Sequence, residues 1–384
     1  MVPDHDINSP KAIAGAIGVM VMVPMFFLVM PMYVGALSDD YGFTNGQIGY
    51  LISIELGSAA LASLTALFWL RQVNWRIVLL VFLVLLAAVN VLSIMVGGAY
   101  ERLLLIRAVA GFSAGAMMAI ALAALGDTQN QDRNFAFGVM GQLGISGCLL
   151  LVLPYFIDGW GAASVFTIFL TACAIAIPLA RWVPSTGKAP AVSNISERKS
   201  LLPLWGLAGS AAIFVGQAAV WAFIERMGSA AGLSPGTIGV ALGSSVFAAI
   251  AGALAASWLA DRNGRRLPMT LAMLGEIICL LFLFEGFTTA VFFAVVIGYS
   301  VCWNFWLPYQ MAVIADTDIS GKFVALITLS QAVGIAVGPA LVGPLISQDN
   351  FDPVVWTGIG FAILAMAMFL PVTASPKTAL ADAS

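Results

Sequence analysis

Two charged residues lie inside long apolar stretches of the sequence, where charge is costly. Glu55 lies in the stretch near residues 47–70, and Arg107 lies in the stretch near residues 103–125. A charge inside a membrane span costs about 2.5–3.5 kcal/mol or more unless it faces protein, water or a partner. We therefore expect Glu55 and Arg107 to form an ion pair. The pair could be a functional site, in which an arriving proton or solute makes the two residues exchange partners. It could instead be a static contact that fixes helix packing.

Uncharged polar and aromatic residues in other apolar stretches could line a cavity for a solute. Amide side chains can hydrogen-bond a solute, but they bond neighbouring membrane helices just as readily. Methionine and aromatic walls adapt to varied apolar shapes, although lipid-facing side chains have the same composition. The residues that we expect to line the cavity are Phe27, Tyr33, Gln142, Gln217, Trp303, Asn304, Tyr309 and Gln331.

The composition indicates that these residues are positioned by membrane-spanning helices. Hydrophobic residues make up 61% of the 384 residues and charged residues only 9%, whereas soluble domains are about one quarter charged. The apolar runs are continuous, which favours helices over the alternating pattern of a barrel. We expect an all-α fold whose twelve spans lie near residues 11–36, 47–70, 77–97, 103–125, 135–157, 163–183, 201–226, 237–259, 268–285, 290–314, 323–346 and 353–371.

The placement of Lys and Arg predicts the topology. If the spans alternate in direction, nearly all cations fall on one side, and only Arg102 lies clearly in a loop on the other. By the positive-inside rule, both termini are cytoplasmic, and we expect a multi-pass protein of the inner, cytoplasmic membrane. The predicted parts are a cytoplasmic tail 1–10, a six-helix bundle 11–183, a cytoplasmic linker 184–200, a second bundle 201–371 and a cytoplasmic tail 372–384.

Cysteine and histidine usage argues against metal and nucleophilic chemistry. The four cysteines each lie singly inside a predicted span, and the one histidine, His5, lies in the N-terminal tail. No GxxxxGK[ST] loop occurs, so ATP coupling within this chain is not expected. We predict no cofactor, no metal site and no nucleic-acid partner, and we do not expect an enzyme because no catalytic set is clustered.

The two halves of the sequence repeat. Asp127 and Asp316 are 189 residues apart, and the same offset relates Gln142 to Gln331. Each half holds six spans, and an even number keeps both copies in the same orientation, related by an axis along the membrane normal. This arrangement predicts a central cavity where the two halves meet.

Three short segments resemble motifs of the major facilitator superfamily. Residues 257–266, Ser-Trp-Leu-Ala-Asp-Arg-Asn-Gly-Arg-Arg, resemble its cytoplasmic loop signature of an Asp, a turn Gly and several basic residues. Residues 107–115, in the fourth predicted span, resemble the Arg-plus-glycine pattern that the superfamily has on its fourth helix. Residues 334–339 are similar to its Gly-Pro motif. The resemblance implies a six-plus-six transporter that works by alternating access.

The loop signature also predicts a cytoplasmic gate held by charge pairs. Such a pair at a helix junction can hold the inner gate shut in one state and release it in another. In the first half, Gln72 and Trp75 replace the expected Asp and Gly. For the acids at helix ends, the alternative is an ordinary solvated charge. The residues predicted for the gate are Asp127, Asp261, Arg262, Arg265 and Asp316.

Glu276 is a further acid inside a span, near residues 268–285. The resemblance implies that this span lies at the periphery, which favours a neutral, protonated glutamate bonded to a neighbouring helix over a functional one.

The sequence thus predicts a secondary transporter for a small organic solute, amphipathic or carboxylate-bearing. We expect proton coupling with Glu55 as the leading titrating residue, and Arg107 available for a carboxylate. We expect the protein to be a monomer. Its expected partners are the solute, a proton and the lipid bilayer. Export of amphipathic compounds and uptake of organic acids both stay open. The alternative from another class is a transporter-like receptor that binds a solute without translocating it.

Overall fold

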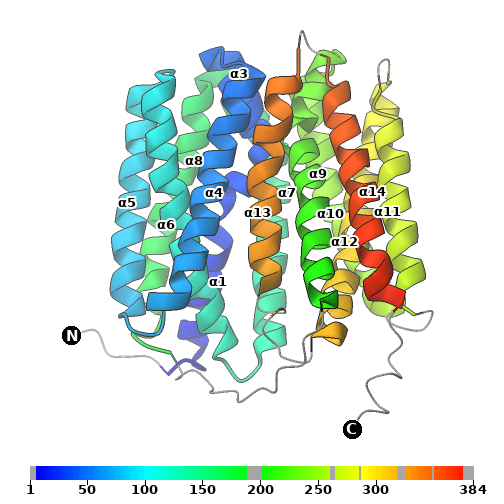
Figure 1. Ribbon diagram of the computed structural model, residues 1–384. Helices are drawn as coiled ribbons and strands as arrows, with labels where there is room; N and C mark the ends of the chain where they lie inside the picture. Colours follow the sequence, from blue (N-terminus) through cyan, green and yellow to red (C-terminus); the bar gives the residue numbers. More distant parts are fainter. Residues whose placement is uncertain are drawn as a thin grey trace, which may run out of the picture. The chain divides into compact units, whose positions relative to one another are not determined.

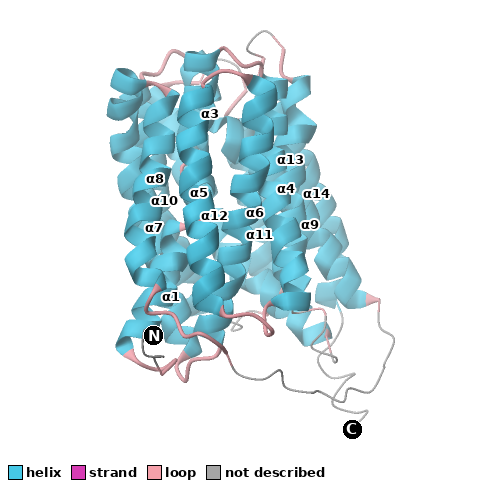
Figure 2. Ribbon diagram, turned by 90° about the vertical axis from the view of Figure 1, so that its left-hand side faces the viewer, coloured by secondary structure: helices cyan, strands magenta, loops and turns pink. Residues whose placement is uncertain are grey.

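The computed structural model of the chain is almost wholly α-helical (Figure 2). It describes residues 6–187, 201–259, 264–284, 287–318, 323, 326–347 and 350–374. In these ranges the only β pairing is an isolated bridge between Ser347 and Asn350. The chain divides into two compact units, residues 1–192 and 193–384, and the division falls inside the predicted linker.

The first unit contains the first six predicted spans. Its described helices are α1 (Pro10–Met22), α2 (Met25–Leu28), α3 (Met30–Tyr41), α4 (Asn45–Trp69), α5 (Trp75–Val96), α6 (Tyr100–Gly126), α7 (Gln131–Trp160) and α8 (Ala162–Ala180). The first span is not one helix, because Pro24 precedes α2 and Pro31 lies in the first turn of α3. Proline has no N–H to donate and is tolerated where a helix begins, so each proline starts a new segment.

The second unit contains the last six predicted spans. Its described helices are α9 (Leu202–Ala230), α10 (Pro235–Leu259), α11 (Arg266–Leu281), α12 (Thr289–Thr317), α13 (Ile327–Val342) with the short extension η2 (Gly343–Leu345), and α14 (Asp352–Ala374). In the described part of the chain, ten helical segments are long and apolar enough to cross a membrane. The segments α1–α3 and the shorter α11 occupy the first and ninth predicted spans, and the all-α membrane fold is confirmed.

Within the first unit, α6 packs against both α4 and α5 (Figure 1). Two glycines on α6 set its distance from α4. A Cβ atom at Gly111 would overlap the backbone carbonyl of Glu55, and one at Gly115 would overlap that of Ala59. Glycine lets two helix backbones approach this closely. The close approach brings Arg107, one turn before Gly111, to the level of Glu55.

In the second unit, two glycines likewise allow a close helix contact, between α13 and α9. A Cβ atom at Gly334 of α13 would overlap the backbone of α9 at Ala211, and one at Gly338 would overlap it at Val215. The four-residue glycine interval of the predicted Gly-Pro motif therefore lies in a helix contact, as small-residue intervals in membrane helices commonly do.

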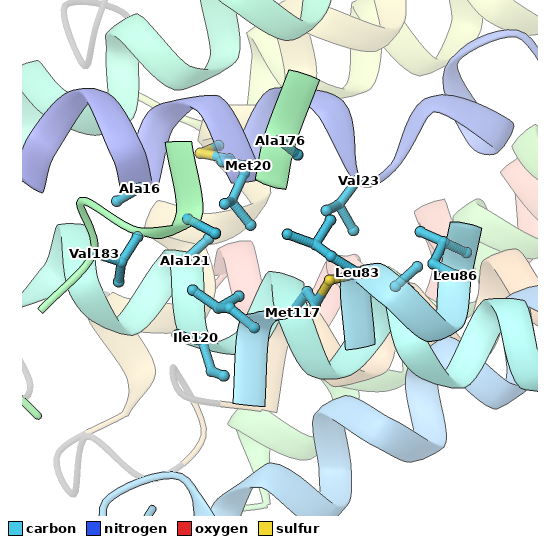
Figure 3. Packing of buried hydrophobic residues seen from close by; sticks show 14 of the residues in the cluster. Ala16, Met20, Val23, Leu83, Leu86, Met117, Ile120, Ala121, Ala176 and Val183 are labelled. Carbon is cyan, nitrogen blue, oxygen red and sulfur yellow. The ribbon is translucent and has the colours of Figure 1, made fainter. Parts of the chain in front are cut away.

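An apolar cluster holds α1, α5, α6 and α8 of the first unit together. Figure 3 shows Met20 of α1, Leu83 of α5, Met117 of α6 and Ala176 of α8 converging on one another. Because lipid is as apolar as these side chains, close packing stabilises the cluster more than burial from water does. The cluster fixes α6, which carries Arg107.

Gly111→Ala should destabilise the protein by about 1–3 kcal/mol, because the added methyl group collides with backbone that cannot rotate away. Gly144→Ala is the matched control, since a Cβ atom there meets nothing within 4 Å. We expect that control to be neutral or stabilising by up to about 1 kcal/mol through helix propensity. Thermal unfolding of the purified protein measures both, and equal melting temperatures for the two variants would contradict the close contact.

Candidate functional site

Arg107 and Glu55 form a buried ion pair inside the first unit. Arg107 Nε donates to Glu55 Oε2 at 3.0 Å, and Arg107 Nη2 donates to Glu55 Oε1. Each side chain is only 1% exposed. A two-point contact between guanidinium and carboxylate is among the strongest hydrogen-bonded arrangements in proteins. The expected pair is therefore present, while its role in coupling stays a prediction.

Three neighbours of Arg107 that are not predicted from the sequence complete its surroundings. Asn90 Oδ1 accepts from Arg107 Nη1 at 2.8 Å, and Asn90 Nδ2 donates to Leu86 O at 2.9 Å. The second bond orients the amide so that its oxygen faces the cation. The rings of Phe166 and Phe169 lie 5.4 and 5.8 Å from Arg107 Cζ, within the range of cation–π attraction. Asn90 is the only amide in its apolar stretch, which is the signal that could have identified it.

A small cavity opens beside the ion pair. Its volume is about 20 Å³, which is room for one water molecule. Glu55, Asn90 and Arg107 form its polar wall, and Met25 and Phe26 contribute to its apolar wall. The last two belong to α2, the four-residue helix between the two proline breaks. The interruption of the first span thus supplies part of the wall facing the charges.

Tyr33 supports the same site from α3. Its ring packs edge-on against Phe166 and Phe169, with centroids 5.7 and 5.9 Å away. Its buried hydroxyl has no hydrogen-bond partner among the residues that the structure describes. Phe27, the other aromatic residue predicted from the first span, is half-buried in α2. Tyr33 thus contacts the same two phenylalanine rings that lie beside Arg107.

Two of the predicted cavity amides bond helix backbone. Gln142 Nε2 of α7 donates to Met20 O of α1 at 2.8 Å, and Asn304 Nδ2 donates to Ser300 O of its own helix at 3.0 Å. Gln331 Nε2 is buried and has no partner in the described ranges. These contacts match the helix-bonding alternative for Gln142 and Asn304, and a solute contact for any of the three stays a prediction.

The second unit contains a polar cluster of its own. Gln217 Nε2 of α9 and Trp306 Nε1 of α12 both donate to Glu276 Oε1 of α11, at 2.9 and 2.8 Å. Glu276 is 1% exposed, and Trp306 is fully buried. Gln217 is a predicted cavity residue, but its partner cannot be read from the sequence. Trp306 is not among the predicted site residues, because a tryptophan in an apolar span gives no sign of what it bonds.

The remaining predicted aromatic residues lie on α12. Trp303 is half-buried and packs edge-on against Phe214 and Tyr299, with centroids 6.0 and 6.3 Å away. The hydroxyl of Tyr309 donates to Ala256 O of α10 at 3.4 Å. Both side chains take part in contacts between helices of the second unit.

Each unit also has an ion pair at the predicted cytoplasmic ends of its helices. Arg71 donates to both carboxylate oxygens of Asp127 in the first unit. Arg265 donates to Asp316 in the second unit. The predicted gate residues Asp261 and Arg262 lie outside the described residues.

Trp75, which replaces the signature glycine in the first unit, takes part in that unit's arrangement. Arg71 Cζ lies 5.4 Å from the centroid of the Trp75 ring, and Trp75 Nε1 donates to Leu70 O at 2.7 Å. The departure from the loop signature therefore does not remove the charge pair of the first unit.

Comparisons with known proteins agree on the fold. A family model described as the Major Facilitator Superfamily matches residues 15–224 and 206–383. The D-xylose-proton symporter has a similar structure, with a TM-score of 0.76 and 13% identity over 96% of this chain and 98% of that one. A mutant of the nucleoside transporter NupG gives a TM-score of 0.73 and 11% identity over 94% of this chain and 99% of that one.

A bacterial homologue of the human lysosomal transporter Spinster gives a TM-score of 0.67 and 13% identity over 96% of this chain and 99% of that one. At these identities the three structures share the fold with this chain and carry no argument about its solute. A sequence comparison with curated proteins gave no match.

Glu55→Gln should lower the free energy of unfolding by about 3–5 kcal/mol, because it leaves Arg107 buried without a counter-charge. Asp127→Asn is the matched control at a partly exposed pair, where Arg71 is 34% exposed, and we expect at most about 1 kcal/mol there. The double variant Glu55→Gln, Arg107→Gln should recover most of the loss. Denaturant unfolding of the purified protein measures all three, and equal costs for the two single variants would show that the Arg107 charge is compensated in another way.

Proposed function

Because the chain belongs to the Major Facilitator Superfamily, we propose that it is a secondary transporter that carries a small organic acid together with a proton by alternating access. The buried Glu55–Arg107 pair is the observation that carries this proposal. Of the two solute classes that the sequence leaves open, the carboxylate-bearing one is favoured because a buried guanidinium is suited to bind a carboxylate.

The proposed coupling follows from the permanent charge of Arg107. Guanidinium is not deprotonated in proteins, so a buried Arg107 needs a negative partner at every stage. Glu55 is that partner in this conformation. When a proton neutralises Glu55, a solute carboxylate can take its place. When the proton leaves, the Glu55 carboxylate competes for Arg107 and displaces the solute, so proton and solute bind and leave together.

The surroundings of the pair suit a solute with an apolar part. The cavity of about 20 Å³ is too small for an organic acid, so binding must widen it. Met25 and Phe26 lie in the short helix α2, which is separated from its neighbours by breaks in the helix. A methionine side chain adapts readily to different shapes. We propose that movement of α2 widens the cavity.

The other predicted roles follow as parts of the same proposal. The pairs Arg71–Asp127 and Arg265–Asp316, together with Asp261 and Arg262, are proposed to hold the cytoplasmic gate. Gln142, Gln217, Gln331, Trp303 and the other predicted cavity residues are proposed to contact the solute in some stage of the cycle. We propose a monomer in the inner membrane with both termini cytoplasmic.

One structurally similar protein is named as a proton symporter, which supports a proton as the coupling ion by analogy. The comparisons give no support to the receptor alternative.

Liposomes that contain the protein and a trapped pH dye test this function. We expect external organic acids to drive a saturable proton flux, while sugars and amphipathic cations do not. Glu55→Gln should abolish the flux because the amide cannot release a proton. Glu101→Gln is the matched control, since Glu101 is an exposed acid at the start of α6, and it should leave the flux unchanged.

Two results would contradict the proposal. A flux that Glu55→Gln leaves unchanged would remove Glu55 from the coupling step. A flux driven by sugars or cations and by no organic acid would contradict the assigned solute class.

A further inference from the structure

We propose that Glu276 is a second proton-binding site, formed where α9, α11 and α12 meet in the second unit. It goes beyond the proposed function, because it assigns a proton to a carboxyl group other than Glu55. Its ligand is a proton that the carboxyl group binds and releases as the packing of the three helices changes.

The hydrogen bonds of Glu276 are compatible with a protonated carboxyl group. Both neighbouring N–H donors, the Gln217 amide and the Trp306 indole, are directed at the same oxygen, Oε1. A neutral carboxyl group has one carbonyl oxygen, which accepts, and one hydroxyl oxygen, which carries the hydrogen. With Oε1 accepting twice, Oε2 is the oxygen on which the proton would reside.

The charges near Glu276 do not provide a cationic partner. None of the ion pairs found among the described residues includes Glu276. On its own helix the nearest cation is Arg266, ten residues away, or about 15 Å along the axis. On α9 the nearest is Arg226, nine residues beyond Gln217, or about 14 Å, and α12 carries no Lys or Arg.

The other titratable groups near Glu276 add no positive charge. Cys279 on α11 and Tyr299 and Cys302 on α12 interact with it electrostatically. The helix α14 also packs against α11, and its only charged residue is Asp352, in its first turn. A carboxylate at this place would therefore be a buried charge without a cationic partner, which membrane interiors strongly disfavour.

The amide of Gln217 can bond Glu276 in either protonation state. Its Oε1 atom is buried and has no hydrogen-bond partner within the described part of the chain. If the amide group rotates by half a turn, this oxygen faces Glu276 Oε1 and can accept a hydrogen carried on that oxygen instead, whereas the present orientation donates to either form. The same amide can thus stabilise Glu276 with and without its proton.

Close packing links the release of this proton to helix movement. A Cβ atom at Gly275, next to Glu276, would lie 2.7 Å from Cys302 Sγ, so α11 and α12 are in close contact at this level. A deprotonated Glu276 needs water or a cation, and neither can reach it until α9, α11 and α12 separate. Proton binding therefore favours the packed arrangement, and opening of the three helices favours release.

Infrared spectroscopy of the full-length protein in lipid vesicles, without any solute, tests this site. We expect a band from a protonated carboxyl group at neutral pH, where exposed carboxyl groups are ionised, and we expect it to disappear in wild type as the pH is raised further. The band should be lost in Glu276→Gln and kept in Glu55→Gln. Trp306→Phe keeps an aromatic ring but removes one donor to Oε1, so it should shift the frequency of the band.

Trp306→Phe also keeps the proposal testable if Glu276→Gln does not fold. A band that persists in Glu276→Gln, or that Trp306→Phe does not shift, would show that it belongs to another carboxyl group and would overturn the assignment. A band that stays at every pH would show a permanently protonated structural residue and would overturn proton exchange. Since no solute is present, each result is independent of the organic-acid proposal.

Discussion

The permanent charge of Arg107 in an apolar interior is the constraint on which the first unit depends. A guanidinium cannot lose its proton, so the fold must supply a counter-charge. Gly111 allows α6 to approach α4 until Arg107 reaches Glu55. Asn90 bonds the remaining side of the cation, and the rings of Phe166 and Phe169 lie beside it. Helix spacing, polar contacts and aromatic packing at this site all satisfy one electrostatic requirement.

The two units repeat in sequence but differ in how they hold a buried acid. At the offset of 189 residues that relates Asp127 to Asp316, the positions of Glu55 and Arg107 correspond to Ser244 and Val296. The second unit therefore lacks the ion pair of the first. Its buried acid, Glu276, lies on a different helix and is bonded by an amide and an indole instead. The repeat preserves the scaffold and the acids Asp127 and Asp316, while their cations, Arg71 and Arg265, do not correspond at this offset. The buried polar groups are also particular to each unit.

Apolar run length was enough to predict the twelve spans, because a lipid-spanning helix has to be both long and apolar. The energetic cost of charge in such spans was enough to predict the Glu55–Arg107 pair. Hydropathy did not show that the first span is broken, since Pro24 and Pro31 lie within an apolar run. It also did not identify Phe166, because a ring beside a cation and a ring facing lipid look alike in sequence.

The pH dependence of solute affinity in the purified protein tests the central claim most directly. If a proton on Glu55 must accompany the solute, the dissociation constant of the best-transported organic acid should rise about tenfold per pH unit once Glu55 is ionised. In Glu55→Gln, which resembles the protonated state, the affinity should be independent of pH. A wild-type affinity that does not change with pH, or an equal dependence in both proteins, would contradict the exchange of counter-charges at Arg107.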